Sequence, residues 1–254
     1  DVFEHSLHCA DFVEQILDPG FRSENPAGKF IPWPPWVTEH FEEEYADGHT
    51  RATYLKLAAL LHDVAKPETK ALHSDGRIRF LRHPMKGAVT SKKILNRLRA
   101  SSKATEAVRV MVDQHLRPSQ LAQKGEMPTS RAVYRYYRDV GDVSVDTLYL
   151  CMADYLAARG PDIDLEDWAK HCEKMRFTLE EKRVQERPER QQRLLTGHDL
   201  MALFNLSPGP ELQPILEMIQ EAHAAGEANT KEEALTMVSQ ALGKDPIKSE
   251  AQHV

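Results

Sequence analysis

The adjacent pair His62 and Asp63 is the part of this sequence best suited to carry chemistry. The pair follows the apolar run Leu-Lys-Leu-Ala-Ala-Leu-Leu at 55–61 and precedes Val-Ala-Lys-Pro at 64–67. An imidazole and a carboxylate at the polar end of a buried helix can bind one cation together, because divalent metals accept mixed nitrogen and oxygen ligands. Two ligands do not make a site, so the other donors must come from elsewhere in the chain.

Four further residues are candidates for these donors. His5 lies in the first expected helix, His83 begins a later helix and His115 ends another. Asp154 has apolar neighbours in Leu-Cys-Met-Ala-Asp-Tyr-Leu-Ala at 150–157. A carboxylate buried in such a helix must be ion-paired, hydrogen-bonded, protonated or bound to a metal. A metal ion would meet that demand.

Helical periodicity dominates the chain and predicts an all-α fold. Apolar stripes run through residues 2–17 and 55–64, which we expect to form the first core helices. Further helices are expected over 84–99, 103–115, 129–139, 143–158, 162–187, 197–204, 210–225 and 230–242. Thr230 and Glu233 have the spacing of a capping box at the start of the last helix.

Two segments depart from this helical pattern. Residues 18–50 contain Asp-Pro-Gly at 18–20 and three further prolines beside Trp33 and Trp36, a composition that breaks regular structure. We expect a long excursion there, which could serve as a lid. The Asp75–Gly76 turn predicts one short hairpin near 71–80.

Composition and helix-breaking residues suggest the organisation of the chain. Pro188 interrupts the helical pattern, so we expect a main domain over 1–187 and a small helical tail domain over 188–254. The net charge of −6 gives no overall attraction to nucleic acid or an anionic membrane, and no apolar run is long enough to span a bilayer. The three cysteines lack paired spacing, which argues against a disulfide framework and fits a cytoplasmic protein.

The order His, then His-Asp, then Asp on successive helices resembles the HD superfamily of metal-dependent phosphohydrolases. The segment Leu-Leu-His-Asp-Val-Ala-Lys-Pro at 60–67 is close to the signature that ends a helix in that family. The resemblance implies an HD-type helical bundle, a phosphate-contacting role for Lys66, and a divalent metal. It assigns the four metal-ligand positions to His5, His62, Asp63 and Asp154.

His83 and His115 match the two additional histidines of superfamily members that bind two metals. In those members the residue equivalent to Asp63 bridges the two ions. The resemblance therefore leaves open one or two ions, and Mg, Mn, Ni and Co are the metals it implies.

Outside these ligands the sequence resembles the HD region of bacterial CCA-adding tRNA nucleotidyltransferases and poly(A) polymerase-like proteins. The matching stretches include 1–5, 77–88 and 114–118, and the tail matches at 194–200, 206–210 and 226–234. Those enzymes also carry an N-terminal polymerase head with a Gly-rich helix start and an Asp-x-Asp metal pair, and no such head is found in this sequence. The resemblance therefore implies phosphatase and 2′,3′-cyclic phosphodiesterase activity on nucleotides or RNA ends rather than nucleotide addition by these residues alone.

The roles of the candidate catalytic residues follow from phosphoester chemistry. Asp63 would hold the metal, and Lys66, one helical turn from His62, would neutralise the phosphate. His83 and His115 would either bind a second metal or contact phosphate and protonate the leaving group, because imidazole titrates near neutral pH. Arg82 and Arg117, next to these histidines, are weaker candidates for phosphate contact.

The sequence is also compatible with other functions. The chain could be a non-catalytic body that positions tRNA within a longer polypeptide, or a di-iron oxygenase that uses the same six ligands. The basic and aromatic string at 131–138 could bind single-stranded RNA, or it could form an amphipathic helix with its tyrosines in the core. We expect a nucleotide or the phosphate of an RNA 3′-end as the substrate, tRNA as a candidate partner, no membrane contact and an undetermined oligomeric state.

Overall fold

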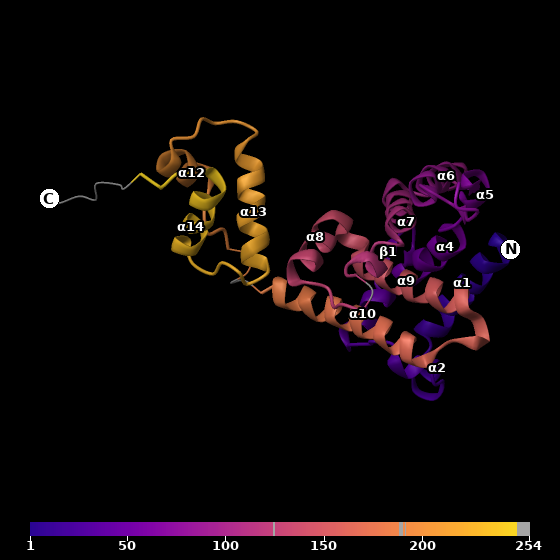
Figure 1. Ribbon diagram of the computed structural model, residues 1–254. Helices are drawn as coiled ribbons and strands as arrows, with labels where there is room; N and C mark the ends of the chain where they lie inside the picture. Colours follow the sequence, from indigo (N-terminus) through magenta and orange to yellow (C-terminus); the bar gives the residue numbers. More distant parts are fainter. Residues whose placement is uncertain (124, 188–189, 191, 248–254) are drawn as a thin grey trace. The chain divides into compact units, whose positions relative to one another are not determined.

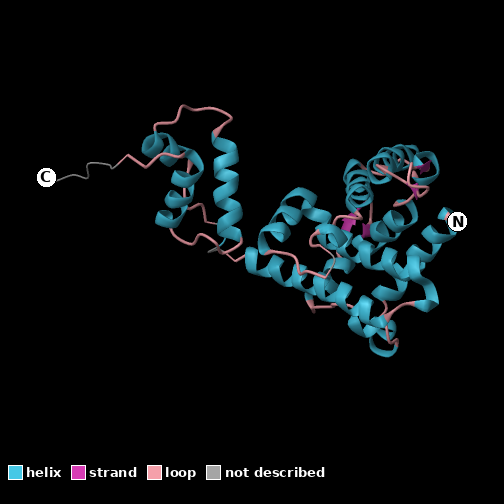
Figure 2. Ribbon diagram, viewed as in Figure 1, coloured by secondary structure: helices cyan, strands magenta, loops and turns pink. Residues whose placement is uncertain are grey.

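Helices make up most of the structure, as the sequence predicts, and two short hairpins supply the strands of the described residues (Figures 1 and 2). The computed structural model describes residues 1–123, 125–187, 190 and 192–247. No helix among them is both long and apolar enough to cross a lipid bilayer. The all-α class and the hairpin near 71–80 are therefore confirmed.

The chain divides into two compact units. Unit 1 comprises 1–127 and 136–179, and unit 2 comprises 128–135 and 180–254, so the division falls within α8 (Ser130–Val140) and α10 (Leu165–Gln185). Pro188, where the sequence predicts a domain boundary, lies outside the described residues. The division into 1–187 and 188–254 stays a prediction.

Unit 1 contains the elements that carry the candidate ligands, and most expected helices are found within a few residues of their predicted ends. Its core helices are α1 (Val2–Leu17), α4 (Arg51–Leu61), α6 (His83–Arg97), α7 (Ser102–Gln114) and α9 (Ser144–Arg159). The short α5 (Lys66–Thr69) and the hairpin of β3 (Ala71–Leu72) and β4 (Ile78–Arg79) connect α4 to α6. Single 3-10 turns follow at Pro118–Gln120, Gly141–Val143 and Gly160–Asp162.

Unit 2 has its own small apolar core, built on α12 (Gly197–Phe204), α13 (Leu212–Ala224) and α14 (Lys231–Leu242). The predicted capping box is present at the start of α14, where Thr230 and Glu233 each satisfy a backbone N–H of the other. A second capping box, of Thr196 and Asp199, begins α12. Local sequence signals therefore start both helices.

Residues 18–50 are more regular than the sequence predicts. They form α2 (Pro19–Glu24), a 3-10 turn (Gly28–Phe30), α3 (Trp36–Glu42), and a hairpin of β1 (Glu44–Ala46) and β2 (His49–Thr50). The prolines do not break these helices, because Pro19 occupies the first position of α2 and Pro35 immediately precedes α3, where a missing N–H costs nothing.

The same segment is held against the core by hydrogen bonds to its backbone. The Trp168 indole N–H donates to the Ala27 carbonyl at 2.8 Å, and the buried Tyr149 hydroxyl donates to the Pro32 carbonyl at 2.6 Å. Val37 and Phe41 of α3 are buried. The segment is thus a packed part of unit 1 in this structure, and its expected use as a lid stays a prediction.

A glycine brings α6 close to the turn that carries His62. A Cβ atom at Gly87 would lie 3.1 Å from a Val112 methyl group and 3.5 Å from the His62 carbonyl oxygen. The absence of a side chain at Gly87 allows α6 to pack closely against both α7 and the end of α4. This packing places His83, one turn earlier on α6, beside the same turn.

Arg51, at the start of α4, is buried and pairs with three carboxylates. Its guanidinium lies 2.9 Å from Glu43, 2.9 Å from Asp142 and 3.4 Å from the fully buried Asp146 near the start of α9. His40 also contacts the Asp146 carboxylate, at 3.0 Å. This network ties the start of α4 to the start of α9.

Replacing Arg51 by Ala should destabilise unit 1 by about 3–5 kcal/mol, because Asp146 would keep a buried charge without its cation. All three tryptophans of the chain (Trp33, Trp36 and Trp168) lie in unit 1, so tryptophan fluorescence during urea unfolding reports that unit alone. Lys170→Ala removes an exposed ion pair with Glu166 and should leave the urea midpoint nearly unchanged, because exposed pairs contribute little to stability. Equal effects of the two changes would contradict a structural role for the network.

Candidate metal centre

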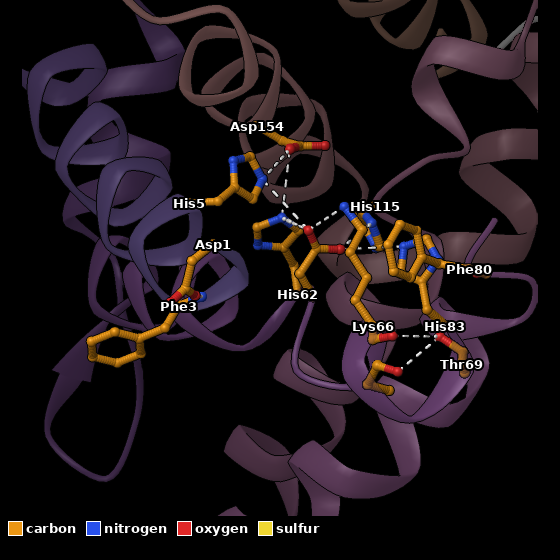
Figure 3. A network of polar contacts seen from close by, with 12 residues as sticks. Asp1, Phe3, His5, His62, Lys66, Thr69, Phe80, His83, His115 and Asp154 are labelled. Carbon is orange, nitrogen blue, oxygen red and sulfur yellow. Dashed lines mark hydrogen bonds and ion pairs between the residues drawn. The ribbon is translucent and has the colours of Figure 1, made fainter. Parts of the chain in front are cut away.

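Six residues predicted from the sequence come together from five helices of unit 1 (Figure 3). In Figure 3 the labelled histidines, Asp154 and Lys66 point towards a common point between the helices. α1 supplies one residue, and the turn after α4 supplies two. One residue each comes from the start of α6, the end of α7 and the middle of α9. These residues are His5, His62, Asp63, His83, His115 and Asp154.

The Asp63 carboxylate lies at the centre of this cluster and is fully buried. Its Oδ2 atom is 3.5 Å from Nε2 of His5 and 3.3 Å from Nε2 of His62. Its Oδ1 atom is 3.3 Å from Nε2 of His83 and 3.9 Å from Nε2 of His115. The two oxygens of one carboxylate therefore face two different pairs of histidines.

Asp154 completes the first of these groups. Its Oδ1 atom lies 3.0 Å from Nε2 of His5 and 3.5 Å from Nε2 of His62. The side chains of Asp154 and His5 are 21% and 18% exposed, whereas His62 is fully buried. The group formed with Asp154 is therefore the more exposed of the two to solvent.

Backbone carbonyls fix the orientation of three of the imidazoles. Nδ1 of His62, His83 and His115 each lies 2.7 Å from the carbonyl oxygen three residues earlier, at Ala59, Phe80 and Val112. The carbonyls of Ala59 and Val112 belong to the last turns of α4 and α7, where carbonyls lack helical partners. If Nδ1 donates to each carbonyl, Nε2 is left as the free acceptor, which is the arrangement common to metal-bound histidine.

The donor atoms fit a divalent metal. Nε2 of His62, His83 and His115 is buried and makes no hydrogen bond to any described residue. A buried polar atom without a partner is costly, and several such atoms aimed at one point are best explained by an ion. Three groups of these residues place their ligand atoms within 4.8 Å of one another, and Asp63 belongs to two of them.

The charges in the cluster interact strongly. Burial alone would raise the pKa of Asp63 and of Asp154, but the neighbouring histidines hold both well below the usual range. Burial would lower the pKa of His62, yet the carboxylates of Asp154 and Asp63 raise it to about 10. Burial lowers the pKa of His115 to about 4, which keeps this imidazole neutral at neutral pH.

Lys66 lies where the sequence predicts, beside the cluster. Its ammonium is 2.5 Å from Oδ2 of Asp63 and 5.8 Å from the centre of the Phe80 ring, and its side chain is 26% exposed. Nothing in the local sequence around Phe80 predicts its contact with Lys66. Arg117 does not face the cluster as a free cation, since it pairs with Asp139 at 2.5 Å.

The basic and aromatic string of α8 resembles a core helix more than an RNA platform. Tyr136 is fully buried and donates to the Ser144 carbonyl, while Tyr137 donates to the Thr178 carbonyl. Arg131 and Arg135 pair with acidic residues of α13 and its following loop, Glu221 and Glu227. This observation favours the amphipathic alternative.

The signal that identified Asp154 also applies to Asp146, which sequence analysis missed. Both are acidic residues among apolar neighbours on α9. Asp146 pairs with Arg51 and His40, whereas Asp154 faces the histidine cluster. The sequence pattern predicts that such a carboxylate needs a partner, but only packing determines which partner it has.

Comparison with known proteins agrees with this geometry. The family model of the HD domain matches residues 2–159. A CC-adding tRNA nucleotidyltransferase of Thermus thermophilus is 36% identical over 181 residues, which cover 70% of this chain and 38% of that protein. An A-adding tRNA nucleotidyltransferase of Deinococcus radiodurans is 32% identical over 198 residues, covering 76% and 42%. The chain thus spans about two fifths of the length of these relatives.

Metal binding should depend on pH. An ion that takes Nε2 of His62 must displace the proton that the carboxylates hold there up to a pKa of about 10. Asp63 and Asp154 are already ionised, so one proton should be released and the affinity for Mn²⁺ should rise about tenfold per pH unit through the neutral range. Calorimetric titration in buffers of different ionisation enthalpy measures this release, and an affinity independent of pH would contradict the prediction.

Proposed function

The chain belongs to the HD domain family, and from this premise we propose that it is a divalent-metal-dependent phosphohydrolase. Its proposed substrates are phosphomonoesters or 2′,3′-cyclic phosphodiesters of nucleotides or RNA ends. The observation that carries the proposal is the convergence of four imidazole Nε2 atoms on the buried Asp63 carboxylate. A buried cluster of this kind has no evident use in packing, and its partly exposed side can admit a phosphate.

We assign the first ion to His5, His62, Asp63 and Asp154, and a second ion to Asp63, His83 and His115. The two faces of the Asp63 carboxylate support a bridging role for this residue. Mg, Mn, Ni and Co are the candidate metals. A set of four imidazoles and two carboxylates favours Mn, Ni or Co over Mg, which prefers oxygen ligands.

Hydrolysis of a phosphoester needs an activated water and neutralisation of phosphoryl charge. A divalent ion supplies both, because it lowers the pKa of a coordinated water and polarises a phosphoryl oxygen. Lys66 adds a cation at the partly exposed side of the cluster, where its ammonium can move from Asp63 to a phosphate oxygen. Asp63 and Asp154 hold the ligand histidines in place by the contacts described above.

The surroundings of His115 support a ligand role over a role as proton donor. Its side chain is almost fully buried, and burial keeps its pKa at about 4, so at neutral pH it is a neutral imidazole and not the imidazolium that a general acid requires. His83 is 9% exposed and begins α6 at the edge of the cluster. It is therefore the better placed of the two to contact a phosphate.

A pocket near the cluster supports a substrate with a nucleoside part. The pocket has a volume of about 590 Å³ and a mainly apolar lining that includes Phe12, Phe21 and Ala157. His8 and Ala157 of its wall follow His5 and Asp154 by three residues on the same helices, about one turn away. This volume is within the range of small-ligand sites.

The relatives provide a second candidate function. Both are tRNA nucleotidyltransferases by name, and this chain matches only part of each. The chain could therefore act as a body that positions tRNA within a longer polypeptide, with or without hydrolysis at the cluster. Metal-dependent turnover distinguishes the two functions.

Metal-stripped protein resupplied with Mn, Ni, Co or Mg should hydrolyse 2′,3′-cyclic AMP and p-nitrophenyl phosphate. Asp63→Ala should lower kcat/KM by at least about a thousandfold, because it removes the ligand shared by both groups of histidines. Release of p-nitrophenol measures one reaction, and formation of adenosine monophosphate from the cyclic nucleotide measures the other. Metal content is determined on the same samples.

Asp167→Ala is the matched control, because Asp167 is an exposed aspartate on α10 and should change neither turnover nor metal content. If the wild-type protein binds two metal ions and the His83→Ala variant binds one, this result would support two ions that share Asp63 as a ligand. Absence of turnover with every metal would reject the hydrolase and favour the tRNA-positioning body.

Filling the pocket should impair the nucleotide reaction alone. Ala157→Phe is expected to lower kcat/KM for 2′,3′-cyclic AMP about tenfold or more and to leave p-nitrophenyl phosphate hydrolysis unchanged, because only the nucleotide has a base to place there. Ala158→Phe, on the next and exposed residue of α9, is the control and should affect neither substrate. Equal losses for both substrates in Ala157→Phe would show that the pocket does not hold the base.

A further inference from the structure

Positive charge is concentrated in one segment of this acidic chain. Residues 66–103 contain eleven Lys and Arg and two acidic residues, a net charge of +9, whereas the rest of the chain carries a net −15. This segment comprises α5, the β3–β4 hairpin, α6 and the start of α7, and it includes His83 of the candidate metal centre. The overall charge of −6 conceals this separation.

The exposed face of α6 presents part of this charge as a line. Arg82, Lys86, Lys93 and Arg97 recur at helical spacing on one side of the helix, and we call these four residues the basic strip. The opposite side is buried and includes Gly87, Ala88, Ser91 and Leu95. At a rise of 1.5 Å per residue the strip is about 22 Å long.

The cations of the basic strip are free to meet a ligand. All four residues are exposed, and none forms an ion pair with a described residue. Surface cations of a folded protein are often balanced by nearby carboxylates, as Arg79 is by Asp75 in the adjacent hairpin. Four unbalanced cations in a line generate a positive potential that attracts a polyanion.

The basic strip begins at the metal centre. Arg82 is exposed and His83 is buried, and the left-handed backbone of Arg82, with φ 64°, turns the two successive side chains to different sides. Nε2 of His83 lies 3.3 Å from Asp63, and Lys86 follows His83 by one turn of α6. A polyanion that lies on the strip therefore has one end beside the cluster.

Apolar side chains border the basic strip. Met85 and Val89 on α6 are 52% and 53% exposed, and Ile78 and Leu81 before the helix are 52% and 60% exposed. Exposed apolar surface of this extent beside a charged line indicates a contact surface. The apolar faces of unpaired bases can lie against such aliphatic surface while their phosphates contact the cations.

From these observations we propose that the basic strip binds the backbone of a single-stranded polynucleotide and leads its phosphorylated end into the His–Asp cluster. The inference rests on the proposed function and deepens it, because it makes a polynucleotide end, rather than a free nucleotide, the preferred substrate. The unbalanced charge and the position of His83 at one end of the strip favour a polynucleotide over an anionic lipid surface.

The test is binding of a fluorescently labelled single-stranded RNA oligonucleotide with a 3′-phosphate end to metal-stripped protein, followed by anisotropy over a series of salt concentrations. Lys86→Glu/Lys93→Glu should weaken binding about tenfold or more at low salt. It should also reduce the slope of log affinity against log salt by about 1.4, since each lost phosphate contact on a single strand contributes about 0.7. The readout needs no turnover, so it remains valid if hydrolysis is not found.

Lys29→Glu/Lys170→Glu is the matched control. Both lysines are exposed and lie outside residues 66–103, and this double variant changes the net charge by the same amount, from −6 to −10. Its RNA affinity should stay within about threefold of the wild type, with an unchanged salt slope. Circular dichroism should give the same helix content for both double variants.

Three outcomes would overturn the proposal. Equal losses in the two double variants would mean that overall charge, not the basic strip, governs binding. Absence of RNA binding by the wild-type protein would show that RNA is not the ligand of the basic strip. Sedimentation with phosphatidylglycerol vesicles that depends on Lys86 and Lys93, without RNA binding, would assign the strip to a lipid surface.

Discussion

The buried carboxylate of Asp63 is the constraint on which the rest of this centre depends. A charge that is removed from water must be compensated, and here four imidazoles and one ammonium surround a single side chain. The compensation determines where helices end. α4 and α7 stop where His62 and His115 take the carbonyls of their last turns, and α6 begins at His83. Helix termination and ligand orientation are therefore one structural feature.

A second buried charge network holds the same scaffold from its other end. Arg51 at the start of α4 meets Asp146 near the start of α9, and His62, just past the end of α4, meets Asp154 further along α9. The two helices thus run in the same direction, with a charged contact to α9 near each end of α4. Apolar packing between them does not specify register closely, whereas paired buried charges do, because a shift would leave each charge without its partner.

The distribution of charge relates the centre to its surroundings. The cluster combines cations and anions at close range. Residues 66–103, which include His83 of the cluster, are strongly basic within an acidic protein. The chain belongs to the HD domain family and is similar to two tRNA nucleotidyltransferases over more than two thirds of its length. A site for a phosphate and a surface for a polyanion are compatible parts of one function.

The sequence by itself determined the helical class, most helix boundaries and the 71–80 hairpin, because these depend on local periodicity, capping and turn chemistry. The unusual placement of His62, Asp63 and Asp154 marked them as candidates, and the resemblance to the HD superfamily selected His5, His83 and His115 beside them. Tertiary structure decided the rest. Prolines at 19 and 35 start helices because of their position at helix ends, and the tyrosines of α8 face the core. Only packing decided that Asp146 meets Arg51 while Asp154 meets histidines, and that the two oxygens of Asp63 face different pairs. Such partners are far apart in the chain, and no local pattern encodes which distant residue will fill the space beside a buried charge.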